Sequence, residues 1–172
     1  MRLLGLPGRL PSTFPAMQAL AARLTGAGDT ARVQPYGFWG GDFTNPDVEP
    51  EAAIAGGSGA ERIVALSIGC LVAMRAHIAH GLRPCACVFI GAPVRRLAAE
   101  GRLDLLARQA HAVPTLFVQR TADPTGAFAE LAAALPHDGQ LRELAGEIHA
   151  YEDVETLAAM IEAWPPWTNS GR

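Results

Sequence analysis

The segment Arg62-Ile-Val-Ala-Leu-Ser-Ile-Gly-Cys70 predicts a buried strand that passes directly into a helix. Its apolar run ends at Ser67, and a small residue stands two positions to either side, Ala65 before the serine and Gly69 after it. A turn of this kind strains the backbone of the serine and exposes its side chain above the sheet. The flanking residues must be small because the strand and the helix nearly touch there. Ser67 is therefore placed as an activated nucleophile would be, or as a serine that only caps the next helix.

Strand and helix patterns alternate along the rest of the chain. The expected strands are Arg2–Leu6, Arg32–Gln34, Ile63–Leu66, Ala86–Ile90, Thr115–Gln119 and Gln140–Leu144. The first expected helix is capped by Ser12 or Thr13 and ends near Gly26, and the last is capped by Asp153 and runs to about Trp164 before Pro165-Pro166. Between them, helices are expected at Glu51–Ile54 (short), Cys70–His80, Leu97–Ala110 (interrupted near Gly101) and Thr125–Leu135.

This alternation predicts the α/β class, with a mostly parallel sheet of about six strands and helices on both faces. Right-handed crossovers place every strand-to-helix loop at one edge of such a sheet. That edge gathers Pro7–Arg9, Ser67, Gly91–Pro93, Thr121–Pro124 and the loop that contains His149. We expect a single domain over residues 1–167 and a flexible tail over residues 168–172.

Two side chains at this edge can complete chemistry around Ser67. A serine hydroxyl needs an imidazole to take its proton and a carboxylate to orient that imidazole. Asp123 follows the fifth expected strand and His149 follows the sixth. Each also has a plainer interpretation, as a turn residue before proline and as an ordinary polar contact near a helix start. Asp42 and Asp47 are alternative acids, but both precede the serine in the chain.

The stretch Ala65-Leu-Ser-Ile-Gly69 resembles the nucleophile elbow Gly-x-Ser-x-Gly of the α/β-hydrolases, with alanine in place of the first glycine. The likeness covers residues 2–164, because Asp-Pro follows the penultimate strand and His-Ala-Tyr precedes the final helix. The chain looks like a small, lidless member without the usual first two strands or a cap insertion. The resemblance implies that Ser67 is the nucleophile, His149 the general base and Asp123 the orienting acid.

The same resemblance implies an oxyanion hole made of two backbone N–H groups. One belongs to Ile68, directly after the nucleophile. The other belongs to the loop after the first strand, where Arg9 is the candidate and Leu10 the reserve. This loop reads Pro7-Gly-Arg where relatives often have His-Gly-x, and Pro7 cannot donate a hydrogen bond.

A substrate pocket has four candidate residues, namely Leu10, Tyr36, Phe38 and Trp39. The three aromatic residues follow the second expected strand, on the side of the sheet where the active site is expected. They could line an acyl or alcohol pocket, or they could close the core beneath the loop.

The remaining histidines favour structural roles. His77 and His80 share a face of one expected helix, but no carboxylate or cysteine nearby completes a set of metal ligands. His111 and His137 flank strands and are expected at the surface. No metal and no cofactor are therefore expected.

The composition excludes several classes of function. All 14 basic residues are arginine, so no Schiff-base, pyridoxal-phosphate or Walker A lysine exists. The net charge of −3, without a basic patch interleaved with aromatics, argues against nucleic acid as a partner.

Cys70, Cys85 and Cys87 lie in or beside apolar runs, which favours buried free thiols in a reducing compartment. The N-terminal apolar run is too short for a signal peptide, and no segment has the length of a membrane span, so we expect a cytoplasmic protein. Abundant Ala, Gly, Arg and Pro favour a bacterial source.

Taken together, these patterns predict a serine hydrolase that cleaves a carboxylic ester or thioester of a small molecule through an acyl-enzyme, with amide hydrolysis as the runner-up. A non-catalytic binding or interaction protein on the same scaffold is the alternative, favoured by the altered oxyanion loop and the short N-terminus. A nucleotide-binding module is less favoured, because the Gly-x-Gly-x-x-Gly pattern is absent. Trp164 and Trp167 are candidates for a homodimer contact or for packing on the domain.

Overall fold

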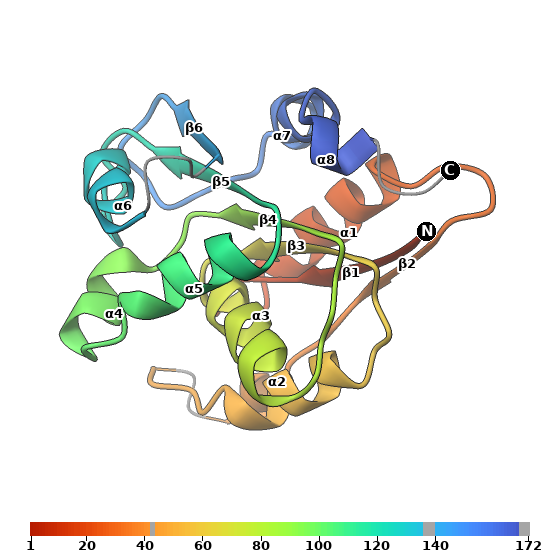
Figure 1. The fold of residues 1–172 in the computed structure, drawn as a ribbon, viewed down its shortest axis with the longest axis horizontal. Coiled ribbons are helices and arrows are strands. Elements are labelled where there is room, and N and C mark those ends of the chain that lie inside the picture. The colour runs from red at the N-terminus through yellow and green to blue at the C-terminus, as the bar shows by residue number, and fades with distance from the viewer. Residues whose placement is uncertain (42–43, 136–139, 169–172) are drawn as a thin grey trace.

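The computed structural model describes residues 1–41, 44–135 and 140–168. Within these ranges, six parallel strands form one sheet in the order β2-β1-β3-β4-β5-β6 (Figure 1). The strands are β1 (Arg2–Leu6), β2 (Thr30–Val33), β3 (Arg62–Leu66), β4 (Ala86–Ile90), β5 (Thr115–Arg120) and β6 (Gln140–Leu144). The expected α/β class with a parallel sheet is confirmed.

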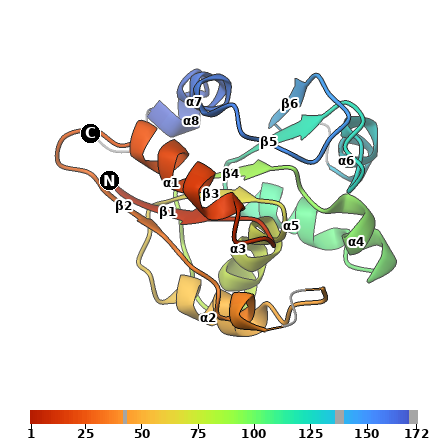
Figure 2. The ribbon, with the colours of Figure 1, turned by 180° about the vertical axis from the view of Figure 1, so that it is seen from behind.

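Helices cover both faces of the sheet, as Figures 1 and 2 show from opposite sides. One face is covered by α1 (Thr13–Arg23), α7 (Val154–Glu162) and α8 (Pro165–Thr168). The other is covered by α2 (Glu49–Gly56), α3 (Ile68–Ala79), α4 (Val94–Ala99), α5 (Asp104–Ala112) and α6 (Phe128–Ala134). A short 3-10 helix, η1 (Gly37–Gly40), lies between β2 and α2.

The two hydrophobic cores use alternate residues of the central strands. In β4, Cys87 and Phe89 pack in the core beneath α2 to α6, whereas Ala86, Val88 and Ile90 pack in the core beneath α1, α7 and α8. Because both faces of β4 are buried, its sequence is apolar without interruption. The edge strands β2 and β6 are partly exposed instead, and their sequences contain polar residues.

Several details differ from the sequence-based expectation: β2 spans Thr30–Val33 instead of Arg32–Gln34, and α2 spans Glu49–Gly56 instead of Glu51–Ile54. No side-chain hydrogen bond caps α1 from Ser12, and the Thr13 hydroxyl instead donates to the carbonyl of Leu10 at 2.7 Å. Helix α6 begins at Phe128 because Thr125 is held in a turn by the side chain of Asp123.

Near the C-terminus, Pro165-Pro166 opens a further helical turn, α8, where we expected the helix to stop. A proline suits the first position of a helix, because its missing N–H would have no partner there. Trp164 is fully buried and Trp167 is 3% exposed, so both pack on the domain. Thr168 belongs to α8, and residues 169–172 of the expected tail lie outside the described ranges.

The cysteines divide between the core and the surface. Cys70 and Cys87 are buried, as expected, but Cys85 is exposed because β4 begins one residue after it. Burial raises the pKa of the Cys70 and Cys87 thiols, which makes them poor nucleophiles. Within the described ranges, no helix is long and apolar enough to span a membrane.

Candidate active site

Ser67 occupies a strained turn between β3 and α3. Its φ of 54° and ψ of −117° make it the one non-glycine residue with a positive φ in the part of the chain that the structure describes. Such backbone strain costs about 1–3 kcal/mol and persists only where the surroundings enforce it. Here the Ser67 N–H donates to the Ile90 carbonyl at 2.9 Å, and the Ser67 carbonyl accepts from the Cys70 N–H at 3.0 Å.

The small residues around Ser67 are required by the close approach of α3 to the end of β1. A Cβ atom on Gly69 would lie 2.7 Å from the Pro7 carbonyl oxygen and closer still to the Leu6 carbonyl oxygen. Real Cβ atoms do not tolerate such contacts with backbone, so only glycine fits. Ala65 is completely buried in the preceding strand. The elbow geometry expected from the sequence is therefore present.

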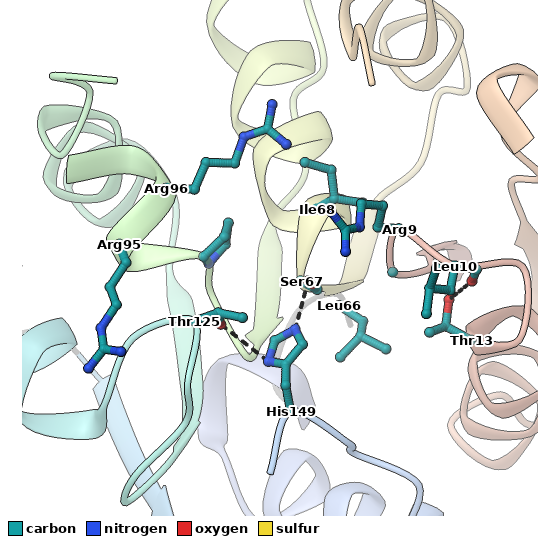
Figure 3. A pocket seen from close by; sticks show the side chains of 12 residues that line it. Arg9, Leu10, Thr13, Leu66, Ser67, Ile68, Arg95, Arg96, Thr125 and His149 are labelled. Atoms are coloured by element: carbon teal, nitrogen blue, oxygen red, sulfur yellow. Dashed lines mark hydrogen bonds between the residues drawn. The ribbon is translucent and has the colours of Figure 1, made fainter. Parts of the chain in front are cut away.

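His149 joins Ser67 to Asp123 across three segments that lie far apart in the sequence. Its Nε2 atom lies 2.8 Å from Ser67 Oγ (Figure 3). Its Nδ1 atom lies 2.8 and 3.0 Å from the two carboxylate oxygens of Asp123. With the imidazole proton on Nδ1, the carboxylate accepts from His149, and Nε2 is left to accept the serine proton.

Asp123 is held as a carboxylate inside the protein. It is 1% exposed, and it accepts hydrogen bonds from the Tyr151 hydroxyl at 2.7 Å and from the N–H and hydroxyl of Thr125 at 2.7 and 2.8 Å. Burial by itself would raise the pKa of Asp123. The hydrogen bonds from His149, Tyr151 and Thr125 together outweigh burial and lower the pKa to about 2. A charged acceptor therefore faces the imidazole at neutral pH.

Tyr151 has a role in this site that the sequence interpretation missed. Besides its bond to Asp123, the Tyr151 hydroxyl accepts from the Arg120 N–H at 2.9 Å, and burial together with the bond to Asp123 raises its pKa far above the usual value. Gly91, at a φ of 58°, lets this ring pass, because a Cβ there would lie 2.6 Å from Tyr151 and 3.0 Å from His149. The sequence feature that could have indicated this role is the position of Tyr151, two residues after His149.

A cavity of about 330 Å³ opens beside Ser67 (Figure 3). Its lining comprises Gly8, Arg9, Leu10, Thr13, Leu66, Ser67, Ile68, Pro93, Arg95, Arg96, Thr125 and His149. Both expected oxyanion residues, Ile68 and Arg9, thus border the same cavity as the serine. In the described part of the chain, neither of their backbone N–H groups donates a hydrogen bond to another backbone group.

The aromatic residues weighed as pocket candidates are not part of the lining of this cavity, whereas Leu10 does line it. Two of them contact the loop after β1. The Tyr36 hydroxyl donates to the Pro7 carbonyl at 3.0 Å, and Trp39 Nε1 donates to the Arg9 carbonyl at 2.8 Å. Tyr36 is 4% exposed and stacks on Phe38, with ring centroids 4.8 Å apart. Of the two roles considered for this trio, the structure gives closure of the core beneath the loop.

The other candidate residues lie in local structural contacts. His77 Nδ1 lies 2.9 Å from the Leu82 carbonyl, and His80 Nε2 lies 3.0 Å from the Glu49 carboxylate. Asp47 accepts from the Glu49 N–H at the start of α2.

His111 is exposed, and Asp42 and His137 lie outside the described ranges. Among residues 1–41, 44–135 and 140–168, no group of three or more His, Cys, Asp and Glu side chains could hold a metal ion.

The parallel sheet, the strained serine after its third strand and the imidazole that follows the last strand define an α/β-hydrolase fold. Two solved structures share it. The esterase domain of a Rhodothermus marinus protein superposes with a TM-score of 0.67 at 14% identity, over 96% of this chain and 85% of that one. A protein described as a non-heme bromoperoxidase, BpoC, from Mycobacterium tuberculosis H37Rv superposes with a TM-score of 0.57 at 17% identity, over 94% of this chain and 90% of that one. No protein-family model matches the sequence, and no curated protein shows significant similarity to it.

Proposed function

We propose that this protein is a serine hydrolase that cleaves a carboxylic ester or thioester of a small molecule, with Ser67 as the nucleophile. The observation that carries the proposal is the continuous chain of hydrogen bonds from Ser67 through His149 to the buried Asp123. The structural likeness to an esterase domain agrees with it.

In the proposed mechanism, Ser67 Oγ attacks the carbonyl carbon of the substrate while His149 Nε2 takes the hydroxyl proton. The ionised Asp123 holds the imidazole in the required tautomer and stabilises the imidazolium that forms. Collapse of the tetrahedral intermediate expels the alcohol or thiol, which receives the proton from His149. Water then attacks the acyl-enzyme by the same relay, which releases the acid and regenerates Ser67.

Negative charge on the tetrahedral oxygen needs two fixed donors. We assign these to the N–H groups of Ile68 and Arg9. Ile68 lies at the first position of α3, where a backbone N–H has no partner within the helix. Arg9 lies in the loop whose carbonyl groups are held by Tyr36 and Trp39, so that loop is supported from below.

Hydrolysis of 4-nitrophenyl butyrate, and of butyryl thiocholine as a thioester, tests the proposal directly. We expect Ser67→Ala and His149→Ala to lower kcat/KM by about 10³-fold or more, because a triad loses most of its power with any essential member. His111→Ala is the matched control, since His111 is exposed and does not line the cavity. Full turnover by folded Ser67→Ala would exclude the mechanism, and an inert wild-type protein would favour a binding role on the same scaffold.

A further inference from the structure

Three arginines line the cavity beside Ser67, and we refer to Arg9, Arg95 and Arg96 as the arginine cluster. The described lining of this cavity contains no aspartate or glutamate. The whole chain carries a net charge of −3, so this concentration of positive charge runs against the average of the molecule.

Two members of the cluster are already paired with carboxylates. Arg95 Nε lies 3.1 Å from each carboxylate oxygen of Glu130, and in Figure 3 its side chain extends away from Ser67. Arg96 Nε donates to Glu100 at 2.7 Å, and its Nη2 donates to the side chain of Asn45 at 3.2 Å. Most of the charge of these two guanidinium groups is therefore compensated within the protein.

Arg9 differs, because its guanidinium has no carboxylate partner among the described residues. Its Nη1 donates to the backbone carbonyl of Thr44 at 3.2 Å, a neutral acceptor. In Figure 3 its side chain lies beside Ile68. The remaining N–H donors of this planar group are available to a ligand, and a guanidinium matches the geometry of carboxylate and phosphate.

Apolar side chains supply much of the rest of the wall, namely Leu10, Leu66, Ile68 and Pro93. Arg9 itself is exposed, so its attraction to an anion acts at the mouth of the cavity and is screened by salt. The cavity therefore offers a short apolar surface next to the serine and one arginine that has no carboxylate partner in the described part of the chain.

We propose that the substrate is an anionic ester, which carries a carboxylate or phosphate close to the scissile carbonyl, and that Arg9 binds this anion with Arg96 as a secondary contact. The inference rests on the proposed hydrolase function and adds the substrate class. Arg9 would then serve twice, through its backbone N–H at the oxyanion and through its side chain at the anion.

Matched pairs of esters test this proposal. Mono-4-nitrophenyl glutarate and its methyl ester differ in charge on the acyl side, and 4-acetoxybenzoate and its methyl ester differ in charge on the alcohol side. For each pair, the ratio of kcat/KM for the anionic ester to that for the neutral ester is measured after subtraction of the uncatalysed rate. Changes in the shared chemical step cancel in this ratio. Competition by butyrate and by propyl phosphate distinguishes the two kinds of anion.

We expect the wild-type protein to prefer the anionic member of at least one pair by about tenfold, the size of one charge-assisted hydrogen bond. Arg9→Gln should abolish that preference and Arg96→Gln should reduce it. Arg108→Gln, on the exposed face of α5, should leave it unchanged. High salt should weaken the preference in the wild-type protein.

The possible failures are distinguishable. Equal turnover of the charged and neutral esters would overturn the anionic substrate class and leave the hydrolase intact. A preference that survives in Arg9→Gln would overturn the assignment of the anion site to Arg9. Absence of any turnover, together with absence of labelling at Ser67 by a fluorophosphonate, would overturn both.

Discussion

Replacement of Asp123 by asparagine should lower the unfolding free energy at neutral pH by at least about 2 kcal/mol. The structure lowers the pKa of this carboxyl from 3.8 to about 2, and each unit of that difference corresponds to about 1.4 kcal/mol. The NH₂ group of asparagine would also replace a carboxylate oxygen that accepts hydrogen bonds from the Tyr151 hydroxyl and from His149 Nδ1. Donor groups would then face each other, and those hydrogen bonds would be lost. Because the pKa is lower in the folded state, the stabilisation is complete above the unfolded pKa and is lost as pH falls between about 4 and 2.

Urea unfolding of the wild-type and Asp123→Asn proteins, followed by tryptophan fluorescence between about pH 7 and 2.5, measures this difference. A carbon-13 NMR titration of the Asp123 carboxyl measures the pKa itself. Asp104→Asn is the matched control, because Asp104 is 62% exposed and its partner Arg108 lies at 3.7 Å. A stability gap that stays constant from neutral pH down to about 2.5 would refute the assigned role of these hydrogen bonds.

Three further substitutions have defined outcomes. Tyr151→Phe should raise the pKa of Asp123 and lower the unfolding free energy by about 1–3 kcal/mol; an unchanged carboxyl titration would contradict this. Gly69→Ala should lower the unfolding free energy by about 1–3 kcal/mol. Gly57→Ala is the control and should be tolerated, because its added Cβ would meet its nearest atom at 3.8 Å. Equal denaturation midpoints of the two variants would refute the close-approach argument. Tyr36→Phe should lower kcat for ester hydrolysis with little change in KM, because the carbonyl that it holds belongs to the loop to which we assign one oxyanion donor. An unaltered kcat would contradict that assignment.

The central strands and the elbow could be predicted because each is fixed by local sequence. Strands β3 and β4 are buried on both faces, so Ile63–Leu66 and Ala86–Ile90 carry an uninterrupted apolar signal that leaves few alternatives. Gly69 marks a backbone contact that no other residue permits. The order of Ser67, Asp123 and His149 along the chain was suggested by the resemblance to the α/β-hydrolases.

Features that depend on contacts between distant segments could not be predicted in the same way. The start of α6 is set by the Asp123 side chain, which holds Thr125 in a turn and delays the helix. Tyr36 was equally compatible with a pocket or with the core, and its hydroxyl reaches a carbonyl 29 residues away. The Tyr151 hydroxyl bonds to Asp123 and to the Arg120 N–H at the end of β5, contacts that its place two positions after His149 does not by itself reveal.

The pairing of the cavity arginines with carboxylates could not be predicted from the sequence for the same reason. Arg9, Arg95 and Arg96 look alike in the sequence, and only the fold shows which of them finds a carboxylate. Glu130 pairs with Arg95 across 35 positions, whereas Glu100 pairs with Arg96 within one helical turn.

The rate of fluorophosphonate labelling, read by intact mass and peptide mapping, is the most direct measure of whether His149 activates Ser67. We expect one adduct, located on Ser67, that is absent in Ser67→Ala and forms far more slowly in folded His149→Ala. Labelling at another residue, or an unchanged rate in His149→Ala, would contradict the proton relay on which the proposed function depends.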